Sequence, residues 1–241
     1  MILKTNNYAA IVNIAINLLE IPITEKDIGD FGIVYHPFFN STYVVYDEKL
    51  IDIFKEKDKF NKYVQQLKEH IQTLNDVYKI VTLVNKPYRI LYLYLIQDYL
   101  TPETFANLLK DCYTETEYPN KDVNVSVEKI KAMFESADKN LIMDNNEKNI
   151  YNNLDNEVTI YRGFFSNKYY KALSWTLDFE KAKFFATRFN NTNGCIYQAN
   201  IKKDDIFAYF DCRNEKEIIA DFDKLYNLKK LNIESKKQAI L

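Results

Sequence analysis

The sequence predicts an α+β fold in which a mainly helical region, residues 1–150, with an early β-hairpin, precedes a β-rich region, residues 151–241, built around one helix. Two observations indicate this division. Apolar residues recur at helical spacing through much of the first region, which also holds all five prolines. After Leu154 the pattern changes to short β-branched and aromatic runs. At ~150 residues per domain, a chain of 241 residues has room for one to two domains.

The first region opens with an apolar stretch, residues 8–19, that two asparagines interrupt. A secretory signal is disfavoured there, because no small-x-small cleavage site follows before Pro22. Two β-branched and aromatic runs, residues 31–39 and 42–46, flank Asn40 and Ser41 and predict the hairpin.

The strongest helical signal runs from Leu50 to Tyr78, where apolar residues recur every three or four positions among Lys and Glu. Further helices are predicted over residues 87–99 and, with Thr101 as N-cap, over residues 102–113. Ser126 predicts the start of another helix. The asparagine-rich residues 145–156 indicate a helix end followed by a loop.

The second region contains five short apolar runs that predict strands, at residues 158–161, 195–201, 206–210, 217–220 and 225–231. Its one helix is predicted over residues 179–189. We expect Thr176 to cap this helix, while Asp178 and Glu180 meet its positive end.

Composition limits the possible partners. The chain has 32 Lys and Arg against 34 Asp and Glu, so no overall positive field favours nucleic acid or an anionic membrane, although a local basic patch stays open. Apolar runs such as residues 90–96 are well short of the ~20 residues that a membrane-spanning helix needs, so no membrane partner is expected. Three cysteines without a Cys-x-x-Cys pair indicate a reduced, cytoplasmic setting.

Several common sites are excluded by residue type and spacing. His36 and His70 have no Cys or second His at ligand spacing, so no metal site is expected. Four glycines supply neither a Walker loop nor a Gly-x-Gly-x-x-Gly loop, which excludes a Rossmann-type nucleotide site. The cysteines have no histidine neighbour and are interpreted as core residues or incidental thiols.

Three polar segments in the β-rich region lie at predicted strand or helix ends, where sites tend to form. They are Tyr161-Arg162-Gly163, Ser174-Trp175-Thr176 and Glu215-Lys216-Glu217. Taken singly, each has an ordinary structural reading, because Ser and Thr cap helices and Glu-Lys-Glu is usually a solvated turn. Their joint order, spacing and flanking elements favour one functional site.

In these residues the chain resembles the arginine-serine-glutamate class of mono-ADP-ribosyltransferases, which transfer ADP-ribose from NAD to a target. The family order is a strand ending in Arg, a strand with Ser-x-Ser or Ser-x-Thr that runs into a helix, and a Glu-x-Glu before a hydrophobic strand. The resemblance covers residues 155 to 225 and implies a split β-sandwich core over residues 151–241. Residues 117–120 and 141–143 are similar to bacteriophage proteins of this class.

The resemblance assigns roles that fit the chemistry of each side chain. Arg162 offers a planar fork of donors for the NAD phosphates, and the Gly163 backbone would hold the nicotinamide carboxamide. Ser174, with Thr176 in the same motif, would face the ribose and orient Glu217. The Glu217 carboxylate would hydrogen-bond to the ribose 2′-hydroxyl and stabilise the cation that forms when nicotinamide leaves.

Glu215, two residues earlier in a segment expected to be extended, would face the same side as Glu217 and bind an acceptor guanidinium. Phe184, Phe185 or Tyr209 would supply an aromatic platform for nicotinamide, and the sequence does not choose among them.

The resemblance thus implies an enzyme that uses NAD as substrate, needs no metal and modifies a macromolecule, with protein arginine as the expected acceptor. A nucleic-acid acceptor, water as acceptor (NAD glycohydrolase activity), and an inactive phage or host-interaction protein that only binds stay open. Two departures from the family, Trp175 within Ser-x-Thr and a short connection at residues 190–194, leave room for weak NAD affinity.

Overall fold

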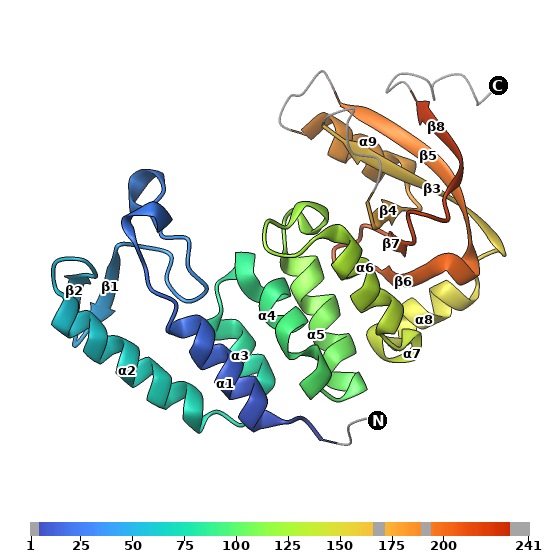
Figure 1. Ribbon diagram of the computed structural model, residues 1–241. Coiled ribbons are helices and arrows are strands. Elements are labelled where there is room, and N and C mark those ends of the chain that lie inside the picture. The colour runs from blue at the N-terminus through green and yellow to red at the C-terminus, as the bar shows by residue number, and fades with distance from the viewer. Residues whose placement is uncertain (1–4, 166–171, 189–193, 232–241) are drawn as a thin grey trace. The chain divides into compact units, whose positions relative to one another are not determined.

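The computed structural model describes residues 5–165, 172–188 and 194–231. The chain forms two compact units, Met1–Val125 and Ser126–Leu241. Both combine helices with antiparallel strands, as Figure 1 shows, so the predicted mixed α+β class is confirmed. The division lies before the predicted boundary at residue 150, and three helices that the sequence grouped with the first region belong to the second unit.

The first unit is mainly helical. Its α-helices are α1 (Tyr8–Leu19), α2 (Lys57–Thr73), α3 (Val77–Leu83), α4 (Arg89–Ile96) and α5 (Pro102–Glu115), joined by 3-10 turns η1 (Glu25–Asp27), η2 (Asp30–Gly32), η3 (Lys86–Tyr88), η4 (Gln97–Tyr99) and η5 (Pro119–Lys121). Their apolar faces form the core, in which Ile11, Ile80 and Leu93 are completely buried. The buried Tyr92 hydroxyl donates to the Ile11 carbonyl at 3.0 Å, which satisfies its polar atom inside this core.

The long helical signal from Leu50 corresponds to three elements. Residues 50–52 belong to a strand, α2 follows, and the chain leaves the helix at Leu74, whose backbone is extended. Asp76 then accepts a hydrogen bond from the Tyr78 amide and starts α3. The apolar periodicity continues across this break because α3 also buries one face, so spacing alone did not reveal the interruption.

The early hairpin is present, and its predicted strand at residues 42–46 is confirmed as β1, but the predicted partner strand at residues 31–39 is wrong. It consists of β1 (Tyr43–Tyr46) and β2 (Lys49–Asp52), whereas residues 31–39 contribute only isolated bridges such as Ile33 with Ser41. Asp47 and Glu48 form the turn with φ of 51° and 57°. A two-residue turn with two positive φ values usually carries Asn-Gly or Asp-Gly, so Asp-Glu gave no turn signal.

Two predicted helix starts are confirmed by their hydrogen bonds. The Thr101 hydroxyl accepts from the Thr104 amide at 3.2 Å before Pro102 begins α5. The Ser126 hydroxyl likewise accepts from the Lys129 amide at the start of α6 (Val127–Ser136). Short polar side chains thus fix these two boundaries locally.

The neutral imidazole ring of His36 links separate segments of the first unit. Its ring is 2% exposed, donates from Nε2 to the Ile21 carbonyl at 3.0 Å and accepts the Phe38 amide at Nδ1 at 3.1 Å. The ring also stacks on Phe39. Burial lowers the pKa of His36 below its usual value, although Asp27 and the Ile21 carbonyl act in the opposite direction.

We therefore expect the first unit to lose stability in mild acid. Because the unfolded chain takes up the His36 proton at a higher pH than the folded chain, stability is fully present above about pH 6.5 and falls as pH decreases toward the lower folded pKa. Melting temperatures between about pH 8 and about pH 5.5 test this. His70→Gln, at a surface helix position, should keep the acid loss, and a flat profile in the wild type would contradict it.

The second unit is built on a six-stranded antiparallel sheet. Its strands are β3 (Glu157–Phe164), β4 (Ser174–Thr176), β5 (Cys195–Lys202), β6 (Ile206–Phe210), β7 (Glu217–Ala220) and β8 (Tyr226–Leu231) in the order β6-β7-β4-β3-β5-β8. Each of the five predicted runs forms a strand. The two central strands, β3 and β4, pair over a short length, because Tyr161 and Thr176 are the one pair of opposite residues between them. The sheet therefore consists of two three-stranded halves joined at this pair.

One helix, α9 (Phe179–Thr187), packs on β3, β4 and β5, as Figure 1 shows. Ala182 and Ala186 are completely buried and form a cluster with Phe179 and Ile196. The predicted N-cap is wrong by two residues: the Asp178 carboxylate caps the helix by accepting the Glu180 and Lys181 amides. Thr176 is instead the last residue of β4, and its hydroxyl donates to the Glu215 carbonyl.

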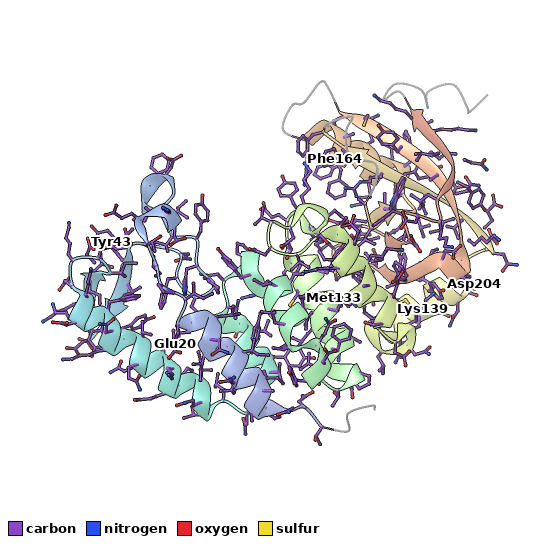
Figure 2. All side chains as sticks on the ribbon, viewed as in Figure 1. Glu20, Tyr43, Met133, Lys139, Phe164 and Asp204 are labelled. Carbon is purple, nitrogen blue, oxygen red and sulfur yellow. The ribbon has the colours of Figure 1, made fainter. Side chains whose placement is uncertain are left out.

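Two further helices hold the turn between β5 and β6, η7 (Lys203–Asp205). Lys139, at the start of α7 (Lys139–Ile142), donates to the Asp204 carbonyl at 3.0 Å, and Figure 2 labels both residues. Tyr151 of α8 (Asn145–Asn152) donates to the Lys203 carbonyl at 3.1 Å. The prediction of a helix end and loop over residues 145–156 is wrong at its start, because α8 forms there.

Candidate functional site

The three polar segments meet on adjacent strands. Arg162 lies in β3, Ser174 and Thr176 form the two ends of β4, and Glu217 begins β7. Thr176 is opposite both Tyr161 and Glu217 in register. Since side chains directly opposite each other share a face, and so do residues two apart in a strand, Ser174, Thr176 and Glu217 face the same side.

Glu217 is a buried carboxylate that interacts with several polar side chains. The residue is 7% exposed, and its carboxylate receives a hydrogen bond from the Ser174 side chain. Burial raises the pKa of Glu217 above its usual value, while the Ser174 hydrogen bond and the positive charges of Arg213 and Arg162 act in the opposite direction. A perturbed acid between two arginines is typical of functional sites, and structural ion pairs also produce it.

Arg162 is anchored by the neighbouring strand. One Nη1–H group donates to the Ser174 carbonyl, and the guanidinium carbon lies 5.7 Å from the centre of the Phe164 ring, which Figure 2 labels at the end of β3. The strand continues for two residues beyond Arg162, so Arg162 does not end it as the sequence predicted. The guanidinium has five donors in a fixed fork, and the bond to Ser174 fixes the direction of that fork.

Gly163 is required by packing. A Cβ atom at this position would lie 1.6 Å from the Ala182 carbonyl oxygen and 2.9 Å from the Ala186 amide nitrogen. Helix α9 therefore contacts the bare backbone of β3. This close approach explains the glycine without reference to a ligand, which is a different reason from the one that the sequence suggested.

A turn at residues 214–216 brings the Glu215 carboxylate to the same guanidinium as the Glu217 carboxylate. The segment is not extended as expected, because Asn214 and Lys216 have φ of 52° and 46°. The Arg213 Nη2 atom nevertheless lies 3.0 Å from the Glu215 carboxylate and 3.7 Å from the Glu217 carboxylate. The two acids thus converge on one guanidinium.

The turn at residues 211–216 is held by residues that sequence analysis missed. The buried Glu147 accepts the Asp211 amide at 3.2 Å, and Asp211 in turn accepts the Lys216 amide at 3.0 Å. The Thr176 hydroxyl donates to the Glu215 carbonyl at 2.7 Å, which gives Thr176 a positioning role. Glu147 also closes a capping box at the start of α8, and the pattern Asp-x-x-Glu at residues 144–147 was the available signal.

The aromatic candidates lie in different surroundings. Tyr209 is 2% exposed, and burial raises its pKa to about 12. Its ring is therefore too buried to stack on a nicotinamide ring. Phe184 is 61% exposed, whereas Phe185 is partly buried, with the Arg188 guanidinium 5.1 Å from its ring centre.

The sequence departs from the family pattern at Trp175 and at the short connection over residues 190–194, and the structure describes the first of these. Trp175 is buried and donates from Nε1 to the Ala172 carbonyl at 2.8 Å, so its side chain belongs to the core. Its neighbours Ser174 and Thr176 face the other side of β4 by alternation. The short connection at residues 190–194 lies outside the described residues apart from Gly194.

Among the described residues, no cluster of His, Cys, Asp and Glu has the arrangement of a metal site. Within that same part of the chain, no helix combines the length and apolar character needed to cross a membrane.

The chain matches no protein-family model, and neither curated proteins nor solved structures provide a similar relative. The side chains at β3, β4 and β7 are therefore the features of the chain that point to a function.

Proposed function

We propose that this protein is a mono-ADP-ribosyltransferase that transfers ADP-ribose from NAD to an arginine of a protein and releases nicotinamide. The observation that carries the proposal is the hydrogen bond between Ser174 and the buried Glu217 on adjacent strands, with Arg162 bonded to the Ser174 backbone. These residues lie in three separate segments of the sequence, which their positions at predicted strand and helix ends and the family resemblance had grouped. Their convergence supports one site with an ADP-ribosyltransferase fold around it.

Each residue has a role that its surroundings support. Arg162 would bind the NAD diphosphate, because its fork is fixed by the Ser174 carbonyl and suits a bidentate contact. Ser174 would hold Glu217 toward the nicotinamide ribose. Phe184 or Phe185 on α9 would lie beside the nicotinamide ring.

In the reaction, the bond between the ribose C1′ atom and the nicotinamide nitrogen breaks, and nicotinamide takes the bonding electrons. The ribose is left with oxocarbenium character. Ionised Glu217 would hydrogen-bond to the ribose 2′-hydroxyl and stabilise this charge in the transition state. The arginine guanidine nitrogen then forms the new bond to C1′ and loses one proton, for which the Glu215 carboxylate or water is the acceptor.

The pair of acids supports arginine as the acceptor. Glu215 lies within ion-pair distance of a guanidinium that also approaches Glu217. An incoming arginine would make the same contacts, since a planar guanidinium matches carboxylates closely. Water or a nucleobase would use neither ion pair.

The test is to incubate the purified protein with labelled NAD and a bacterial lysate and to measure both released nicotinamide and labelled macromolecules. We expect nicotinamide release together with label on protein. Release without label would indicate a glycohydrolase, and label on nucleic acid would change the acceptor. If neither appears and millimolar NAD leaves the melting temperature unchanged, the protein does not use NAD, because a ligand at 100 times its Kd should add ~2.7 kcal/mol of stability.

A further inference from the structure

The chain has four arginines, Arg89, Arg162, Arg188 and Arg213, and their surroundings differ. Arg89 pairs with Glu115 in the first unit. Arg162 bonds to the Ser174 backbone, and Arg188 lies over the Phe185 ring. Arg213 contacts two carboxylates, those of Glu215 and Glu217. It therefore places a guanidinium at the position that the proposed function gives to the acceptor.

The distances from Arg213 Nη2 to the Glu215 and Glu217 carboxylates suit an acceptor that is positioned for reaction. At 3.0 Å, Nη2 of Arg213 is within hydrogen-bond distance of Glu215. At 3.7 Å from Glu217, the same atom is too far for a hydrogen bond, so Glu217 can still bind a ribose hydroxyl. The Arg213 side chain is 46% exposed, against 10% for Glu217, so the guanidinium approaches the buried acid from the solvent side.

The turn holds Arg213 in place. Arg213 lies two residues before Glu215, and the Asn214 amide donates to the Asp211 carbonyl at 2.9 Å. Asp211 is itself bound to Glu147 and to the Lys216 amide. A group attached this closely acts at a high effective concentration, so a free arginine competes with it at a disadvantage.

We propose that Arg213 is an intramolecular acceptor, so that the protein ADP-ribosylates itself at Arg213. This inference rests on the proposed function. The C1′–nicotinamide bond of NAD breaks, an Nη atom of Arg213 bonds to C1′, nicotinamide leaves with the bonding electrons, and one guanidinium proton passes to Glu215 or water. No further reactant is needed.

The test uses the full chain and NAD alone, with released nicotinamide and peptide mass spectra measured on the same samples. We expect one ADP-ribose on the peptide that contains Arg213. The modified fraction should rise at the same rate after a roughly tenfold dilution of the protein, because the step is intramolecular. Arg213→Lys should lose this modification, and Arg89→Lys, at an ion pair in the first unit, should keep it.

The outcomes separate this inference from the proposed function. Nicotinamide release with ADP-ribose absent from Arg213 overturns the self-acceptor and leaves the transferase intact. Modification that slows in proportion to dilution shows transfer between molecules and also overturns it. Absence of both nicotinamide release and modification overturns the two proposals together. Since the site is read directly in the wild-type chain, misfolding of a variant does not affect the conclusion.

Discussion

Glu217→Gln is expected to lower nicotinamide release from NAD by ~10²–10³-fold. Gln keeps the shape and can still bond to Ser174, but it carries no charge to stabilise the cation at C1′. The effect should appear in kcat with little change in KM, because the lost interaction forms mainly in the transition state. Initial rates of nicotinamide release across NAD concentrations measure both.

Glu215→Gln is the matched control. It also changes a carboxylate that contacts Arg213, but it leaves unchanged the buried Glu217 carboxylate that receives the Ser174 hydrogen bond. We expect this variant to reduce transfer to arginine much more than nicotinamide release. Equal loss of nicotinamide release in both variants would contradict the separate roles, and full activity of Glu217→Gln would exclude the proposed mechanism.

Glu217→Gln should also stabilise the fold at neutral pH. Burial raises the pKa of Glu217 in the folded chain above its unfolded value, so its contribution to stability is greatest below the unfolded pKa and is lost as pH rises through the folded pKa. Gln is neutral at every pH and avoids this loss. The variant should melt higher than the wild type near pH 7, by ~2–4 °C per kcal/mol, with the difference disappearing below about pH 4.

Gly163→Ala is expected to have the largest effect on stability. The new Cβ would lie 1.6 Å from a backbone carbonyl oxygen of α9, and no side-chain rotation can relieve that contact. The helix must move away from β3 and open the cluster of Ala182 and Ala186. We expect a loss of at least ~3 kcal/mol, the upper part of the range for overpacking, or a drop of ~10 °C in melting temperature.

Gly29→Ala is the control for this prediction. A Cβ at Gly29 would lie 2.7 Å from the Tyr35 hydroxyl oxygen and 2.8 Å from its ring, but Tyr35 is 61% exposed and its side chain can rotate into solvent. The φ of Gly29 is −89°, which alanine adopts without strain. Thermal unfolding of the two variants should differ clearly. Similar melting temperatures would show that β3 and α9 do not pack as closely as described.

The parts of the fold that the sequence predicted correctly depend on interactions between residues that are close in the chain. The caps at Thr101 and Ser126 each depend on a hydroxyl and an amide three residues away. The strand runs of the second unit depend on alternation within a few residues. Where two local signals competed, as Thr176 and Asp178 do before α9, the outcome depended on the path of the chain out of β4.

The candidate site was predicted in part. The sequence selected Arg162, Ser174 and Glu217, which the structure brings together on β3, β4 and β7. It offered Tyr209 as one of three aromatic platforms for nicotinamide, and the structure buries that residue. It did not find Arg213, which belongs to no recognised motif, or the role of Glu147, because a capping-box pattern does not reveal the hydrogen bond from the Asp211 amide to Glu147.

By itself, the sequence determined the mixed helix and strand content, most element positions and the three polar segments, because each depends on residues that are near in the chain. Only the tertiary structure decided the order of the strands, the close contact of Gly163 with α9 and the meeting of Glu215, Glu217 and Arg213. The pairing of β4 with both β3 and β7 sets the burial that raises the pKa of Glu217, and the hydrogen bonds of the turn to Glu147 and Thr176 hold Glu215 and Arg213 near it. Such properties arise from long-range contacts that no local pattern contains.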